Sequence, residues 1–282
     1  MSGDLSITAQ YTSATWAWAG FPDAELLVTR DARRVFDVTN AALAIARVVA
    51  RDQPSLRHSL VQRHAMIDHL LAERGAHHVI ELAAGLSRRG ATASRDPEVS
   101  YVEVDLPDVI ERKRALLGRT PAGQAVLARA NLVLVASDVA TIALAALAPV
   151  RAPVFVIAEG LVMYLAGDAR RALFGKVAAS DDTVDFVFDL VPSDELPPPG
   201  RIGTALERTM KRFTGGRSFE RDAHSRDQIA SELRAAGFAT VSAHDPASVA
   251  AAWQLPHARE HTQMVVFHAR ASQLRANSAV RS

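Results

Sequence analysis

Residues 78–90 read HVIELAAGLSRRG, and this stretch decides the fold of the chain. It begins with a short apolar run typical of a buried parallel strand, then breaks into three small residues, Ala83-Ala84-Gly85. A strand that ends in small residues lets a ligand approach the backbone closely. Glu81 lies at the end of the apolar run, where a parallel sheet forms its ligand crevice.

A second apolar run, YVEVD, ends at Asp105, twenty residues after Gly85. A glycine turn followed at this distance by an acid on the next strand is typical of a Rossmann-like unit, in which the acid accepts hydrogen bonds from ribose hydroxyls. The dinucleotide pattern G-x-G-x-x-G is absent, because residues 83–88 read AAGLSR. The pattern therefore favours a nucleoside ligand without a pyrophosphate, and the alternative is an ordinary strand–turn–helix connection.

The composition is that of an ordinary globular protein, with 49% hydrophobic and 22% charged residues among 282. A net charge of +1 gives no electrostatic reason to expect nucleic acid or an anionic membrane as a partner. The absence of cysteine excludes disulfides, thiolate nucleophiles and cysteine-ligated zinc, and no ligand cluster at a recognisable spacing predicts another metal. No segment resembles a signal peptide or a membrane span, so we expect a cytoplasmic enzyme.

Strands and helices alternate from residue 78 onward. This rhythm predicts an α/β fold of the Rossmann-like type, with a mostly parallel sheet and helices on both faces. The last two predicted strands, 238–244 and 263–270, form a closing pair, and one of them can run antiparallel to the rest of the sheet. The other predicted strands are 78–83, 99–105, 131–136, 153–158 and 183–190, and the helices between them are 87–94, 107–117, 121–129, 139–147 and 167–179.

The remaining segments predict additions to this core. Helices at 31–50 and 59–74 precede the first strand, whereas residues 1–30 lack a clear period and carry a cluster of aromatic residues. That cluster is either an arm packed on the domain or a lid over a flat, apolar substrate. A proline-rich stretch indicates an insertion, within which a helix is predicted at 201–213. A further helix is predicted after the insertion, at 225–236. The expected parts are a helical extension or lid (1–75), a cofactor-binding core (76–191), an insertion (192–224) and the end of the core (225–282).

Four acids lie at or near the carboxyl ends of predicted strands: Glu81, Asp105, Asp138 and Glu159. Ligands bind beyond those ends in an open parallel sheet, so the four acids are expected to converge on one crevice. Asp138 has an alternative role, because it could cap the helix predicted at 139–147.

Three motifs in order resemble those of the leucine carboxyl methyltransferase superfamily. Residues 81–86, ELAAGL, resemble its ELGAGLDTR motif, and residues 102–110, VEVDLPDVI, with Lys113 resemble EVDLPxVIxxK. Residues 158–165, AEGLVMYL, are similar to EGxLMYL. Arg63 with Ile67-Asp68 resembles the R-x-x-x-ID element on the preceding helix. Order and spacing agree over roughly 60–170, and the aromatic N-terminal arm resembles the bacterial polyketide O-methyltransferase branch.

The resemblance implies a class I methyltransferase fold that binds S-adenosylmethionine and releases S-adenosylhomocysteine. Arg63 would meet the methionine carboxylate, and Glu159 would lie near the cofactor's amino group. Gly85 would leave room for the cofactor, Asp105 would hold the ribose hydroxyls and Asp138 would address the adenine amino group. The full cofactor-binding set, with Val139 beside the adenine ring, is Arg63, Glu81, Gly85, Asp105, Leu106, Ser137, Asp138, Val139 and Glu159. The substrate-contacting candidates are Tyr11, Trp16, Trp18 and Tyr164.

The chain departs from the family motif within the glycine loop. Ala83 replaces the first glycine, and Ser87 and Arg88 replace the usual Asp-Thr. Alanine is still small, so room for the cofactor is expected to survive. Arg88 or Arg89 would then serve the substrate, or both would be solvated residues at the start of a helix.

The expected activity is methyl transfer to a carboxylate or hydroxyl of a small, natural-product-like molecule, with a carboxylate preferred. A carboxylate is already ionised at neutral pH, whereas a phenol or alcohol needs a base. Two other functions stay open: a methyltransferase-fold protein that binds the cofactor but catalyses a non-methylating reaction or acts as a binding module, and a nucleotide-dependent oxidoreductase. The sequence specifies neither the acceptor nor the oligomeric state. The histidines available as bases, none with an evident partner, are His224, His244, His257, His261 and His268.

Overall fold

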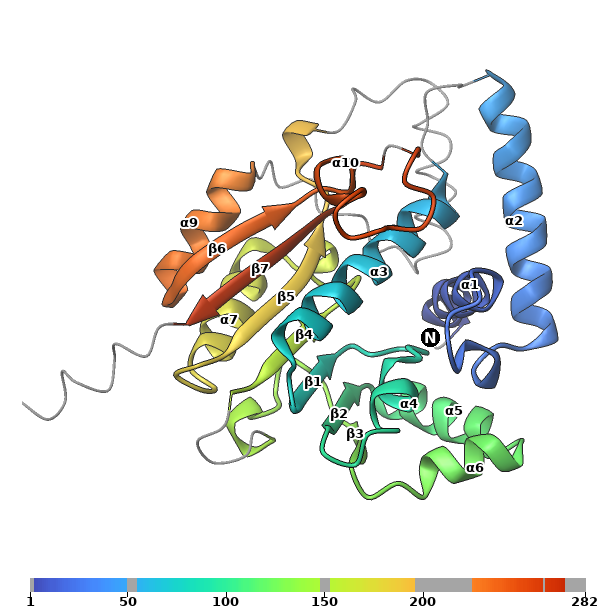
Figure 1. The fold of residues 1–282 in the computed structure, drawn as a ribbon, viewed down its shortest axis with the longest axis horizontal. Coiled ribbons are helices and arrows are strands. Elements are labelled where there is room, and N and C mark those ends of the chain that lie inside the picture. The colour runs from blue at the N-terminus through green and yellow to red at the C-terminus, as the bar shows by residue number, and fades with distance from the viewer. Residues whose placement is uncertain (1–2, 50–54, 148–152, 196–224, 261, 272–282) are drawn as a thin grey trace, which may run out of the picture.

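A single seven-stranded sheet organises the structure, a computed structural model that describes residues 3–49, 55–147, 153–195, 225–260 and 262–271. The strand order is β3-β2-β1-β4-β5-β7-β6 (Figure 1). Every predicted strand is confirmed, with ends shifted by at most two residues: β1 (His78–Leu82), β2 (Ser100–Asp105), β3 (Leu132–Ala136), β4 (Phe155–Ala158), β5 (Asp185–Leu190), β6 (Phe238–His244) and β7 (Val265–Ala271).

Strands β1 to β5 are parallel, and β7 runs antiparallel to both β5 and β6. The carboxyl ends of the parallel strands therefore meet at one edge of the sheet, where ligands bind in such folds. The α-helices are α1 (Gly3–Trp18), α2 (Arg30–Val49), α3 (Leu56–Arg74), α4 (Arg89–Ala93), α5 (Pro107–Leu117), α6 (Pro121–Leu127), α7 (Gly167–Ala178), α9 (Arg226–Ala236) and α10 (Pro246–Val249). Short 3-10 turns are η1 (Ala24–Leu26), η2 (Leu144–Ala146), η3 (Val162–Tyr164) and η4 (Ser193–Glu195).

Helices cover both faces of the sheet, as the alternation predicts. Val79 and Phe155, neighbours on β1 and β4, belong to the core beneath α3 and α10. Ile80 and Val156, the next pair in the register, face the core beneath α7 and α9. Because successive strand residues point to opposite faces, each strand contributes to both cores, which explains its nearly continuous apolar sequence.

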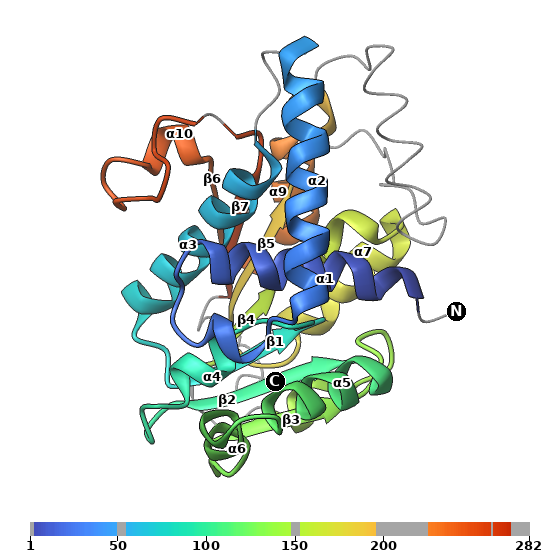
Figure 2. The same ribbon diagram turned by 90° about the vertical axis from the view of Figure 1, so that its right-hand side faces the viewer.

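The N-terminal segment forms a helix that the sequence did not predict. Its weak periodicity concealed α1, which is held by tertiary contacts rather than by an amphipathic pattern. The Tyr11 ring lies 5.4 Å from that of Phe36 on α2, and the Trp16 ring lies 4.5 Å from His64 on α3. Figures 1 and 2 place α1 beyond the carboxyl ends of β1 and β4, next to the ligand edge of the sheet.

The helix predicted at 139–147 is wrong, since only η2 forms there. Asp138 Oδ1 accepts the N–H of Ala140 at 2.8 Å, and the Asp138 carbonyl accepts from Thr141 and Ile142. Lys176 on α7 donates to the carbonyls of Val139 and Ala140, at 3.0 and 2.6 Å. The contacts of Lys176 take two carbonyls that would accept hydrogen bonds in a helix, so tertiary context overrides the helical propensity.

The helix predicted at 201–213, and most of the insertion at 192–224, lies outside the described residues. Its flanks are tied together, because Arg226 at the start of α9 pairs with Glu195 at 2.5 and 2.9 Å. Among the described helices, none combines the length and apolarity needed to cross a membrane.

Candidate functional site

The glycine loop follows β1 and faces the ligand edge of the sheet. The Gly85 N–H donates to Asp105 Oδ2 at 2.6 Å, and the Leu106 N–H donates to Oδ1 at 2.7 Å. Burial raises the pKa of the Asp105 carboxyl, while these two backbone donors oppose that shift. Gly85 has a φ of +53°, and a Cβ built there would meet nothing within 4 Å, so open space lies before the loop. The loop thus holds a carboxylate in place and leaves room for a ligand.

Ala83 adopts a φ of +50°, a left-handed conformation, at the position where the family motif has glycine. A side chain with a Cβ costs about 1–2 kcal/mol there. We expect Ala83→Gly to raise the free energy of unfolding by about 1 kcal/mol, because relief of this strain exceeds the extra entropy of glycine in the unfolded chain. Urea unfolding measures the change. Ala84→Gly is the matched control. Ala84 has no positive φ, so its replacement by glycine is expected to lower the free energy of unfolding. Equal destabilisation by both substitutions would contradict the strain.

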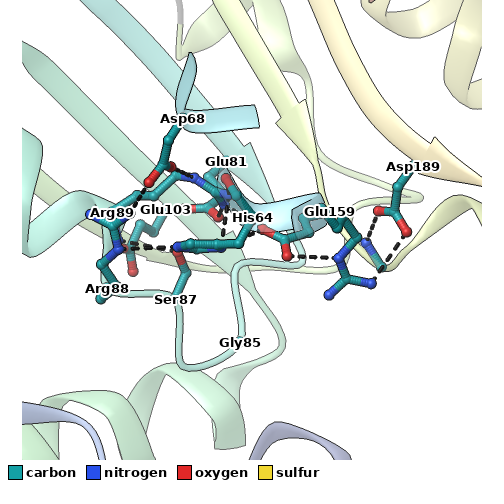
Figure 3. Close-up of polar contacts among 12 residues, drawn as sticks. His64, Asp68, Glu81, Gly85, Ser87, Arg88, Arg89, Glu103, Glu159 and Asp189 are labelled. Atoms are coloured by element: carbon teal, nitrogen blue, oxygen red, sulfur yellow. Dashed lines mark hydrogen bonds and ion pairs between the residues drawn. The ribbon is translucent and has the colours of Figure 1, made fainter. Parts of the chain in front are cut away.

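Glu159, directly after β4, is the centre of a buried ionic cluster (Figure 3). Its Oε1 accepts from Arg63 Nε at 2.8 Å, and its Oε2 lies 2.9 Å from His64 Nδ1 and 2.6 Å from Arg89 Nη1. Burial alone would raise the pKa of Glu159, but Arg89, Arg63 and His64 together hold it well below its usual range. Glu159, one of the strand-end acids predicted to lie at this edge, is therefore a salt-bridged carboxylate.

The two arginines of the glycine loop belong to the same cluster. Arg89 is only 2% exposed, and its guanidinium contacts Glu81 Oε1 at 3.0 Å and Asp68 Oδ1 at 2.6 Å. Arg88 pairs with Asp68 and donates from Nε to His64 Nε2 at 3.1 Å. Of the two alternatives for these arginines, solvation at the start of a helix is wrong, because both are buried, and a role toward the substrate stays a prediction. Their carboxylate partners lie on α3, β1 and beyond β4, which draws the side chains inward.

Glu81 is buried beneath this cluster. Its second oxygen accepts from the Tyr101 hydroxyl at 2.8 Å, so both of its oxygens have protein partners. Glu81 is thus joined to the cluster through Arg89, and its predicted contact with the cofactor stays a prediction.

Asp189, near the carboxyl end of β5, is a site residue that the sequence analysis missed. Its Oδ2 accepts from Arg63 Nη1 at 3.2 Å, and its Oδ1 accepts from the Gly160 N–H at 2.5 Å. Burial raises the pKa of Asp189 although Arg63 is adjacent. The available signal was its position, because Asp189 lies near the carboxyl end of an apolar strand, as the four predicted acids do.

His64, also missed as a site residue, has partners at both ring nitrogens. Arg88 Nε donates to its Nε2 at 3.1 Å, and its Nδ1 lies 2.9 Å from Glu159 Oε2 and 2.8 Å from Arg89 Nη2. Burial, followed by the charge of Arg89, holds the pKa of His64 well below its usual range. Trp16 and Phe21 flank the ring, with centroids 4.5 and 5.1 Å away. His64 therefore links the cluster and is not available as a base.

A second buried ion pair contacts the glycine loop. Lys113 on α5 pairs with Glu103 on β2 and donates to the Ser87 carbonyl at 2.6 Å. Burial raises the pKa of Glu103 to about 7, with Lys113 opposing the shift and Glu81 adding to it. Lys113, the lysine of the EVDLPxVIxxK motif, is thus buried and hydrogen-bonded to the glycine loop.

The adenine-side candidates form the turn after β3. The Ser137 N–H donates to the Asp105 carbonyl at 2.9 Å, which joins this turn to the end of β2. Asp138 is exposed, and Val139 is half-buried against the core. Oδ1 of Asp138 accepts from the Ala140 N–H, and contact of Asp138 with a ligand stays a prediction.

The aromatic candidates fall into two groups. Tyr11 and Trp16 are buried: the Tyr11 hydroxyl donates to Asn40 at 3.2 Å, and the Trp16 indole N–H finds no partner among the described residues. Trp18 is 39% exposed, with Arg57 above its ring, and Tyr164 is half-buried with its pKa raised by burial. Contact with a substrate stays a prediction for all four residues.

Three of the five histidines predicted as possible bases lie among the described residues, and none of the three contacts the ionic cluster around Glu159. His268 bonds Asp185, the first residue of β5, at 2.6 Å, and therefore lies toward the opposite edge of the parallel strands. His257 stacks on His58 and Trp18, and His244 lies near Trp253. His224 and His261 lie outside the described residues. The described part of the chain also contains no group of three or more residues able to hold a metal ion.

The charge balance of the crevice suits a cation. Three guanidinium groups face five carboxylates, and the interposed His64 is neutral. S-adenosylmethionine carries a sulfonium, an ammonium and a carboxylate, so its net charge is opposite to that of the site. The open space at Gly85 and the carboxylate of Asp105, which the Gly85 N–H holds in place, lie beside this cluster at the carboxyl ends of β1 and β2. The groups counted are Arg63, Arg88, Arg89, Asp68, Glu81, Asp105, Glu159 and Asp189.

The strand order and this crevice define a class I methyltransferase fold. The sequence model of the leucine carboxyl methyltransferase family matches residues 22–178, and the chain belongs to that family. Its cofactor is S-adenosylmethionine, as predicted. No curated protein sequence matches the chain.

Solved structures share the fold at low sequence identity. A protein of Thermobifida fusca YX, provisionally described as a methyltransferase, is 16% identical with a TM-score of 0.54, covering 93% of this chain and 94% of that one. A provisional O-methyltransferase of Nostoc punctiforme PCC 73102 is 15% identical with a TM-score of 0.52, covering 75% and 56%. The S-adenosylmethionine-dependent methyltransferase SibL is 17% identical with a TM-score of 0.51, covering 74% and 55%. The chain thus spans little more than half the length of the last two.

Proposed function

We propose that the chain is an O-methyltransferase that transfers the methyl group of S-adenosylmethionine to the carboxylate of a small organic acid of natural-product type. The observation that carries this proposal is that the described residues of the ionic cluster offer no available base: His64 is held neutral, and Glu159 and Asp189 are salt-bridged. A carboxylate needs no base at neutral pH, whereas a hydroxyl does. The bound cofactor supplies an electrophilic methyl group, and alignment of the acceptor with it provides much of the catalysis.

The cofactor roles proposed from the family motifs agree with the contacts of these residues. Arg63 uses Nε and Nη1 for Glu159 and Asp189, which leaves Nη2 to donate to the methionine carboxylate. Glu159 offers negative charge for the ammonium, and Asp105 offers it for the ribose hydroxyls. Asp138 would accept from the adenine amino group. Leu106, Ser137 and Val139 would contribute backbone and apolar surface around the nucleoside.

The proposed acceptor site lies under the N-terminal arm. Trp18 and Tyr164 keep exposed surface, so they are the better placed of the four aromatic candidates to touch an acceptor. An arm of this kind supports an aromatic or polyketide-like substrate, because its rings offer flat apolar contacts. Assignment to the polyketide O-methyltransferase branch of the family rests on this arm.

Methyl transfer from labelled cofactor to size-matched aryl acids and phenols, at pH 6 to 9, tests the proposal. We expect esters of the acids, with a rate per enzyme that is flat over this range because the acceptor is ionised throughout. Turnover of phenols alone, rising about tenfold per pH unit, would overturn the carboxylate assignment. Product formation that S-adenosylhomocysteine supports as well as S-adenosylmethionine would instead favour the non-methylating alternative.

A further inference from the structure

We infer that Lys176 is a positioning residue for adenine recognition: it holds the turn after β3 in the irregular form that presents Asp138 to the base. This inference rests on the proposed role of Asp138. Lys176 lies in the last turn of α7, far along the chain from the turn that it contacts. Its Nζ donates to Val139 O at 3.0 Å and to Ala140 O at 2.6 Å.

Lys176 donates hydrogen bonds to two main-chain carbonyls of the turn. Asp138 O is satisfied inside the turn by Thr141 and Ile142, whose N–H groups donate at 3.0 and 3.1 Å. The next two carbonyls have Lys176 as their partner. In an α-helix these carbonyls would accept from residues four positions later, so the ammonium replaces helical bonds. The half-buried side chains of Val139 and Ile142 pack against the core cluster to which α7 also contributes, and this packing holds the turn near Lys176.

Lysine is also unusual in this chain, which has 32 basic residues but lysine only at positions 113, 176 and 211. Each of the two lysines in the described residues donates to a main-chain carbonyl of a crevice loop: Lys113 to Ser87, and Lys176 to the turn after β3. A compact ammonium with three donors suits convergent carbonyls better than the planar fork of arginine. A lysine that donates to main-chain carbonyls therefore supports a loop on the proposed methionine side of the crevice and another on the proposed adenine side.

Discrimination between S-adenosylhomocysteine and S-inosylhomocysteine provides the test, because the inosine analogue replaces the amino donor by a carbonyl that repels Asp138. Calorimetric titration of the wild-type chain is expected to show at least about tenfold tighter binding of the adenosine compound. In Lys176→Met we expect the affinity for S-adenosylhomocysteine to fall by about tenfold and the ratio between the ligands to drop below about threefold. Lys176→Gln gives the same readout if the methionine variant does not fold.

Two controls separate positioning from general damage. Arg171→Met removes an exposed cation from the same helix and should change neither affinity nor ratio. In an Asp138→Ala background, Lys176→Met should have no further effect on the ratio, because both residues act through one contact. A folded Lys176 variant that binds both ligands more weakly but keeps the wild-type ratio overturns the inference alone. A wild-type chain that binds S-adenosylhomocysteine without distinguishing the two compounds overturns the adenine role of Asp138, and this inference with it.

Discussion

Asp105→Ala is expected to weaken the binding of S-adenosylhomocysteine by about a hundredfold or more while the chain stays folded. The substitution removes the carboxylate proposed for the ribose hydroxyls, and charge-assisted hydrogen bonds contribute about 1.5–3 kcal/mol each. It also releases the N–H groups of Gly85 and Leu106, both of which donate to this side chain. The glycine loop would then lose its side-chain tether to β2 as well as its proposed ligand contact, and would keep the backbone bond from the Ala84 N–H to the Val104 carbonyl. Calorimetric titration measures the change.

Asp108→Ala is the matched control for this variant. Asp108 lies three residues later, exposed in the first turn of α5. Its removal changes the net charge equally but touches no crevice contact, so affinity should stay within about twofold. Similar binding by wild type and Asp105→Ala would contradict the assignment of the ribose site, and would require the ligand to lie elsewhere on the sheet edge.

Glu159→Gln is expected to lower the free energy of unfolding by about 3–5 kcal/mol, because it leaves buried guanidinium groups without their shared counter-charge. Arg63, His64 and Arg89 all contact this carboxylate. Urea unfolding at neutral pH measures the loss. The control is Glu25→Gln, whose carboxylate pairs with Arg33 but is 66% exposed, and which should change stability by less than about 1 kcal/mol. Comparable small losses in both variants would show that the cluster contributes little to folding.

The effect of Glu159 should also depend on pH in one direction. Its partners outweigh burial and hold its pKa well below the ordinary value of 4.5, so the unfolded chain binds the proton first as the pH falls. The stabilisation is therefore complete above pH 4.5 and is lost as the pH falls through the folded-state pKa. The difference in stability between wild type and Glu159→Gln should shrink on acidification below this point.

Long-range pairing explains why the sequence analysis found some site residues and missed others. Gly85 and Asp105 lie in neighbouring units of a repeating strand–helix pattern, so their spacing along the chain carries their relation in space. Arg63 and Asp189 are separated by 126 residues, and no local pattern joins them. Arg89 looked like a solvated helix start because its three carboxylate partners come from separate elements. Its burial follows only when α3, β1 and β4 are assembled.

The sequence by itself determined the sheet, the glycine loop and the family, because apolar runs, small residues and motif spacing are local signals that survive without knowledge of the partners. Tertiary structure alone decided α1, which lacks an amphipathic pattern, and the turn at 139–142, whose helical propensity yields to Lys176 and Asp138. It also decided the partners of the buried acids, such as Arg89 and Tyr101 for Glu81. The physical reason is common to these cases: buried backbone and charged groups must find partners, and the partners here are distant in sequence.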